Sequence, residues 1–131
     1  MAAREAACSC GQLKLIVEGD PLRVSVCHCL ACQRRTGSAF GVQARFPRDR
    51  VEIMGSSHGY TRISDDGGPA TFSFCPECGA TVYYVIAAAP EIVAVPVGAF
   101  ADPTFPSPSF SVWEERQHAW VTMPPDVERH P

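Results

Sequence analysis

Seven cysteines, grouped in three short clusters, constrain this chain more than any other feature of its sequence. The clusters are Cys8 with Cys10, then Cys27, Cys29 and Cys32, then Cys75 with Cys78. The number is odd, and the start of the chain lacks the apolar stretch of a secretory signal, so a disulfide framework is not expected. In a reducing compartment, such close spacings are typical of metal ligands. We therefore expect a cytoplasmic protein whose thiols bind metal.

The segment Cys75-Pro-Glu-Cys78-Gly79 is typical of a zinc knuckle. Two intervening residues let one tight turn offer two thiolates to one ion, and Gly79 can adopt the positive φ that such a turn needs. Zinc takes four ligands, so a second pair is required. Cys8 and Cys10 would complete a closed, structural four-thiolate site. A redox dithiol fits less well, because no βαβ pattern surrounds the pair.

The three remaining cysteines, Cys27, Cys29 and Cys32, lie within six residues and can reach one ion together. Three protein ligands are typical of a catalytic zinc site, so we predict that these cysteines act in catalysis through a second zinc. On an extended backbone His28 points to the opposite side, which favours a hydrogen-bonding or substrate-binding role for it. A second structural zinc, closed by His28 or by a remote residue, stays open as the alternative.

Alternating apolar and polar residues predict an all-β fold built from small antiparallel sheets. We expect strands near residues 13–17, 22–26, 40–46, 51–54, 72–74, 80–86 and 92–97. Pro96 has no N–H to donate, so the last strand is expected at a sheet edge or a bulge. Residues 30–36 form the one expected helical turn, capped by Gly37. A single domain is expected over residues 1–124, with a frayed tail at 125–131.

Charge and hydropathy exclude two classes of partner. The net charge of −3 gives no general attraction to nucleic acid or to anionic membranes. No apolar run approaches the ~20 residues that a membrane span requires. We therefore expect neither nucleic acid nor a membrane as a partner of this protein.

Three motifs and their order make the chain similar to a known family. They are Cys-x-Cys-Gly at residues 8–11, Cys-His-Cys-x-x-Cys-Gln-Arg-x-x-Gly-Ser at 27–38 and Phe-x-Phe-Cys-x-x-Cys-Gly at 72–79. Together with Val97-Gly-Ala-Phe100 and Trp120, they resemble the glutathione-dependent formaldehyde-activating enzyme family, which also includes centromere protein V. The resemblance implies a β-tent fold related to zinc ribbons. It also implies two zinc ions, a structural one on Cys8, Cys10, Cys75 and Cys78 and a catalytic one on Cys27, Cys29 and Cys32.

The activity implied by the resemblance is that of a carbon–sulfur lyase, which joins glutathione to formaldehyde as S-hydroxymethylglutathione. The expected partner is therefore a small thiol or a thiol–aldehyde adduct, with glutathione as one candidate. Zinc with three thiolates carries a formal charge of −1, and Arg34 and Arg35 follow the ligands directly. These arginines are candidates to bind substrate carboxylates. The alternative function is a non-catalytic, zinc-stabilised binding module on the same fold.

Overall fold

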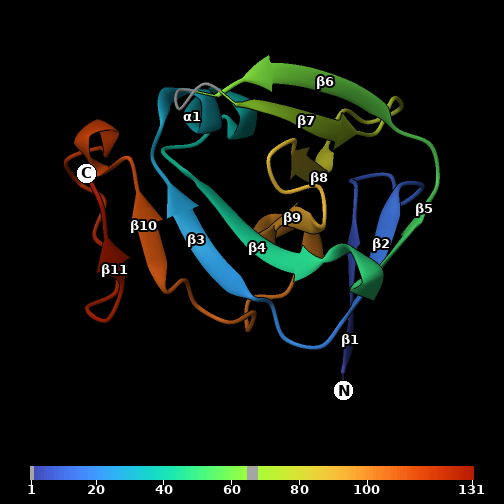
Figure 1. Ribbon diagram of the computed structural model, residues 1–131, viewed down its shortest axis with the longest axis horizontal. Coiled ribbons are helices and arrows are strands. Elements are labelled where there is room, and N and C mark those ends of the chain that lie inside the picture. The colour runs from blue at the N-terminus through green and yellow to red at the C-terminus, as the bar shows by residue number, and fades with distance from the viewer. Residues whose placement is uncertain (1, 65–67) are drawn as a thin grey trace.

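The computed structural model describes residues 2–64 and 68–131, and these residues fold mainly into β-strands (Figure 1). A three-stranded antiparallel sheet has the order β1-β2-β5. Its strands are β1 (Ala3–Ala7), β2 (Lys14–Glu18) and β5 (Val51–Met54). No helix in the described residues is long and apolar enough to cross a membrane.

A larger, eight-stranded sheet has the order β11-β10-β3-β4-β9-β8-β7-β6. Its strands are β3 (Arg23–Cys27), β4 (Gly41–Pro47), β6 (His58–Ile63), β7 (Pro69–Phe74), β8 (Thr81–Ile86), β9 (Ile92–Pro96), β10 (Phe110–Val112) and β11 (Glu128–Arg129). The helix α1 (Leu30–Thr36) follows β3, and three short 3₁₀ helices lie at Arg48–Arg50, Val97–Phe100 and Glu114–Arg116.

The expected all-β class and the positions of the expected strands are confirmed. The expected helical turn is also confirmed, because α1 ends at Gly37, which adopts φ 67°. The expectation of purely antiparallel sheets is wrong, since β10 runs parallel to both β3 and β11. The proline-rich segment before β10 returns the chain to the start of β3, where Ser109 N donates to Val24 O at 2.9 Å, so β10 enters in the same direction as β3.

Two further expectations differ from the structure: the edge position of the strand that contains Pro96, and the frayed tail. Strand β9 is not an edge strand, because it lies between β4 and β8. Pro96 is its last residue, so the missing N–H falls at the strand's end, where a 3₁₀ helix begins. The tail at 125–131 is not frayed. Glu128–Arg129 pair with β10, and Val127 is buried. A strand of two residues is too short to show the alternation of apolar and polar residues from which strands are predicted.

The two faces of the large sheet serve different purposes. One face packs on the three-stranded sheet and forms the main core, which includes Leu15, Val17, Phe46, Val93 and Val95. Side chains alternate along a strand, so the intervening residues of β4, β8 and β9 point to the opposite face. That face carries a smaller cluster that includes Phe72, Tyr84 and Ala94. In Figure 1, α1 and the β6–β7 hairpin lie at one end of this sheet, near the end of β3.

The close contact of Gly55, directly after β5, with the backbone of Gln12 can be tested by mutation. It has φ +97°, and an added Cβ would collide with the backbone oxygen of Gln12. The side chain of Gln12 also binds Ser56 through both backbone groups, at 2.7 Å to the oxygen and 2.9 Å from the nitrogen. We expect Gly55→Ala to lower the free energy of unfolding by more than about 2 kcal/mol, measured by chemical denaturation. A loss as small as that of the control Gly98→Ala, whose Cβ would meet open space, would contradict this reading.

Candidate metal centres and the adjoining cleft

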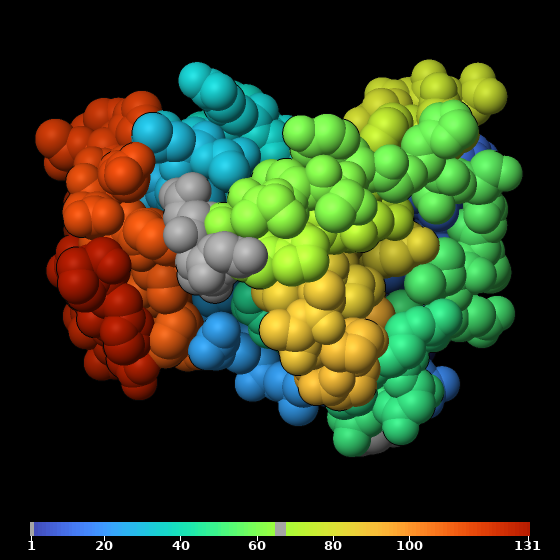
Figure 2. Space-filling view, turned by 45° about the horizontal axis from the view of Figure 1, so that its top comes forward, coloured from blue at the N-terminus to red at the C-terminus, as the bar shows by residue number. Residues whose placement is uncertain are grey.

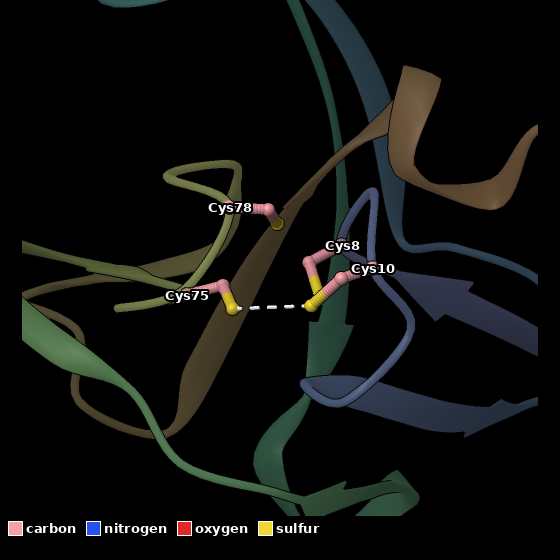
Figure 3. Close-up of side chains that lie close together, drawn as sticks. All are labelled: Cys8, Cys10, Cys75 and Cys78. Carbon is pink, nitrogen blue, oxygen red and sulfur yellow. Dashed lines mark hydrogen bonds between the residues drawn. The ribbon is translucent and has the colours of Figure 1, made fainter.

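Four cysteines from distant parts of the chain meet between the two sheets (Figure 3). Cys8 and Cys10 lie in the loop between β1 and β2, and Cys75 and Cys78 lie in the turn between β7 and β8. All four sulfurs lie within 4.8 Å of one another, and Cys10 Sγ is 3.6 Å from Cys75 Sγ. The cluster could hold a metal ion, and it contains the four residues that the sequence groups into the closed site.

The surroundings of this cluster supply hydrogen-bond donors to its sulfurs. The backbone N–H groups of Leu13 and Glu77 each donate to a cluster sulfur at 3.3 Å, and Gln12 Nε2 donates to Cys75 Sγ at 3.0 Å. Burial would raise the pKa of Cys75, but the hydrogen bonds from Gln12 and from backbone N–H groups outweigh it and lower the pKa to about 6. Donors aimed at sulfur satisfy its negative charge, so the donor set fits a four-thiolate metal site. Sequence reasoning did not identify Gln12.

Cys27, Cys29 and Cys32 form a second cluster, with their sulfurs also within 4.8 Å of one another. Cys27 ends β3, Cys29 caps the N-terminus of α1, and Cys32 lies in the first turn of the helix. Cys29 Sγ accepts a hydrogen bond from Cys32 N at 3.3 Å, and all three side chains are buried. Hydrogen bonds from its two neighbours lower the pKa of Cys29 to about 2. This cluster could also hold a metal ion.

His28 follows Cys27 directly but is not a member of either cysteine cluster. Its ring is fully buried, and Nε2 lies 3.0 Å from the hydroxyl of Ser111. That hydroxyl donates to Glu114 at 2.7 Å, and Glu114 is paired with Arg129 at 3.0 Å. The expected hydrogen-bonding role of His28 is therefore what the structure has. Its candidate role as a substrate-binding residue stays a prediction; in the structure the ring ties the end of β3 to the C-terminal segment.

The three-cysteine cluster opens onto a cavity of about 260 Å³ on the outer face of the large sheet. Its walls include Arg23 and Ser25 from β3, Gln43 and Arg45 from β4, Arg62 from β6 and Tyr84 from β8. Val112 and Trp113 pack against the cysteines from the C-terminal side. None of the polar wall residues was singled out from the sequence. The signal was present in their spacing, because residues 23, 25 and 27 of β3 share one face.

Two further cavities adjoin this one, since they share walls with it. A cavity of about 520 Å³ shares Arg62 and Phe72 and is also lined by Arg34 and Arg35 of α1. The guanidinium of Arg35 lies 5.4 Å from the centre of the Phe72 ring, and that of Arg62 lies 4.9 Å from it. Arg34 is exposed at the rim. The structure thus brings both predicted arginines to a cavity that borders the cysteine cavity.

The other adjoining cavity, of about 330 Å³, shares Arg23, Arg45 and Tyr84 with the cysteine cavity and extends toward Ile92. We call the three together the cleft. Figure 2 shows the start of β3 (blue) at the surface between the C-terminal segment (orange) and the β8–β9 region (yellow). Among the described residues, five arginines and no carboxylate line the cleft. The protein is acidic overall, but the cleft is suited to an anion.

Comparisons with known proteins agree with this architecture. A family model described as glutathione-dependent formaldehyde-activating enzyme matches residues 3–116. No curated protein matches the chain. A crystal structure of a Rhodobacter sphaeroides protein, a structural-genomics target, is similar in fold, with a TM-score of 0.59 and 22% identity over 76% of this chain and 91% of that chain. Because the family model spans most of its length, the chain belongs to the glutathione-dependent formaldehyde-activating enzyme family.

Proposed function

We propose that this protein is a zinc-dependent carbon–sulfur lyase that acts on an adduct of a thiol and a small aldehyde, such as S-hydroxymethylglutathione. The observation that supports the proposal best is that the three-cysteine cluster lines a cavity whose walls also carry Arg23, Arg45 and Arg62, and that the adjoining cavity adds Arg34 and Arg35. The proposed metal is zinc in both clusters, because all-thiolate donor sets with such spacings suit zinc. The reduced state of all seven cysteines suits a cytoplasmic location.

The shape of the cleft suits a peptide-sized thiol. Glutathione carries its thiol on the central residue and a carboxylate at each end. The cysteine cavity itself is lined by Arg23, Arg45 and Arg62, and the adjoining cavity of about 520 Å³ adds Arg34 and Arg35. No salt bridge to a described carboxylate occupies any of these five guanidinium groups. A thiol placed at the cysteines would therefore have cations available for both of its carboxylates.

The chemistry requires a thiolate and a protected place to react. A zinc ion held by three thiolates would supply a place for a fourth sulfur ligand and would favour its deprotonated form near neutral pH. Cys27, Cys29 and Cys32 would hold that ion, and Val112 and Trp113 cover one side of the cluster. The adduct forms when the sulfur makes a bond to the aldehyde carbon and the carbonyl oxygen takes up a proton. No oxidant or reductant is needed, and the reverse reaction releases both partners.

Metal content is the first test of this proposal. We expect the purified protein to contain two zinc ions per chain, one resistant to mild chelation and one labile, because four thiolates enclose an ion more completely than three. Structural zinc contributes on the order of 10 kcal/mol, comparable to the stability of a whole domain, so Cys75→Ala should give unfolded or insoluble protein. Elemental analysis that finds no zinc, or a soluble Cys75→Ala variant with the wild-type melting temperature, would contradict the assignment.

The second cluster should be needed for activity and dispensable for folding. Cys32→Ala removes one of three thiolates, which leaves too few to hold the ion for substrate, but it leaves the main core unchanged. We expect this variant to fold, to bind one zinc ion and to lose the accelerated condensation of glutathione with formaldehyde. The rate is measured by NMR against the uncatalysed reaction. If the wild type accelerates no such reaction with any thiol in a panel, the protein is a binding module instead.

The arginines should act on substrate affinity. Arg23 lines the cysteine cavity, and Arg35 lines the adjoining one. Arg35→Ala and Arg23→Ala each remove one of these cations, so each should raise KM for glutathione about tenfold and change kcat little. A thiol without carboxylates, such as 2-mercaptoethanol, should show no such change. Arg50→Ala is the matched control, because Arg50 is exposed and lies outside the cleft. Equal effects on the two thiols would argue against carboxylate binding.

A further inference from the structure

The side chain of Gln43 is one of three in the described residues, with His28 and Arg35, that have a buried polar atom without a partner. Gln43 is only 3% exposed, and its Oε1 is buried with no hydrogen-bond partner. Its amide makes no hydrogen bond to any residue in the described parts of the chain. An unpaired buried acceptor costs about 1–3 kcal/mol, so its presence calls for a partner outside the fold.

The register of the sheet places this amide beside the three-cysteine cluster. Cys27 of β3 pairs with Gly41 of β4, and Gln43 lies two residues farther along β4 on the same face. Diagonal neighbours of this kind have their Cβ atoms about 7–8 Å apart or less, within reach of a long side chain. Both Gln43 and the three cysteines line the cavity of about 260 Å³.

Tyr84 brings a donor to the same cavity. Tyr84 of β8 pairs with Ala94 of β9, and Ala94 pairs in turn with Arg45 of β4. The small side chain of Ala94 leaves the phenol room to extend over β9. The Tyr84 ring stacks on Phe72 at 4.6 Å, which fixes its orientation, and its hydroxyl has no hydrogen-bond partner among the described residues. Burial raises the pKa of Tyr84 to about 12, so the hydroxyl keeps its proton at neutral pH.

We infer that the Tyr84 hydroxyl and the Gln43 amide together bind the oxygen of the aldehyde-derived carbon, an inference that rests on the proposed function. In the condensation, Tyr84 donates a hydrogen bond to the carbonyl oxygen as the C–S bond forms and the C=O π bond opens. The oxygen then takes up a proton equivalent to the one that the thiol released. The resulting hydroxyl donates to Gln43 Oε1. The cavity therefore selects a hydroxymethyl thioether over an unsubstituted thioether.

Kinetics of two variants test this inference. Tyr84→Phe removes only the hydroxyl, and Gln43→Met removes the amide at nearly constant volume. We expect kcat for condensation to fall on the order of 100-fold in Tyr84→Phe, as for other lost oxyanion donors, and about tenfold or more in Gln43→Met. Tyr83→Phe is the matched control, because Tyr83 packs against the core on the other face of β8.

Measurements of ligand binding distinguish a role of Tyr84 and Gln43 at the substrate oxygen from a role in holding the thiol. In the cobalt-substituted protein, the sulfur-to-metal absorption produced by glutathione alone should be the same in both variants and the wild type. The wild type should bind S-hydroxymethylglutathione, kept at equilibrium with excess formaldehyde, more tightly than S-methylglutathione, and Gln43→Met should lose this preference.

Three outcomes would overturn the inference. Unchanged kcat in both variants, with an active wild type, refutes the role of the pair and leaves the proposed function standing. Loss of the cobalt–thiol absorption together with activity assigns the two side chains to the metal site instead. An inactive wild type refutes the proposed function and this inference with it.

Discussion

The contact among Cys8, Cys10, Cys75 and Cys78 is the constraint on which the rest of the structure depends. It joins the hairpin of the small sheet to the turn between β7 and β8, which are far apart in the chain. Cys8 and Cys75 are also part of the main core, so the cluster and the apolar packing stabilise the same junction. The four thiols could hold a metal ion, which would tie the two sheets together at this junction in addition to the apolar packing.

The cleft exists because the two faces of the large sheet carry side chains of different sizes. The inner face is filled by branched and aromatic side chains, whereas small residues such as Gly41 and Ala94 lie on the outer face between larger ones. A Cβ on Gly41 would lie 2.9 Å from a terminal nitrogen of Arg35, so this glycine lets the guanidinium lie close to the sheet. The same alternation therefore produces both a core and a binding surface.

Local patterns in the sequence were enough for the strands, the helix end at Gly37 and the division of the cysteines into four and three. These depend on neighbours within a few residues or on the strict ligand requirements of metal ions. The cleft residues Arg23, Gln43 and Tyr84 could not be found in this way. Their proximity depends on which strands pair and in which register, and that information is spread across four strands, β3, β4, β8 and β9.

The pairing of β10 and β11 at one edge of the large sheet also differs from the expected antiparallel arrangement, for a physical reason. Parallel pairing of β10 with β3 arises from a long proline-rich connection, and short strands such as β11 have almost no periodicity to detect. His28 was expected to have a hydrogen-bonding or substrate-binding role, because on an extended backbone its side chain points away from those of Cys27 and Cys29. The residue that determined its role, Ser111, lies far along the chain and carried no signal of its own.

The parallel pairing of β10 with β3 has a consequence for the order in which the protein can be built on the ribosome. All four cysteines of the first cluster have been synthesised once the chain has passed Cys78. The second cluster has its three thiols much earlier, yet its cover of Val112 and Trp113 comes from the last part of the chain. During synthesis those three thiols therefore remain open to solvent and to competing metals or oxidants. The final strands complete the cover of this cluster, so the C-terminal segment protects the three thiols as well as extending the sheet.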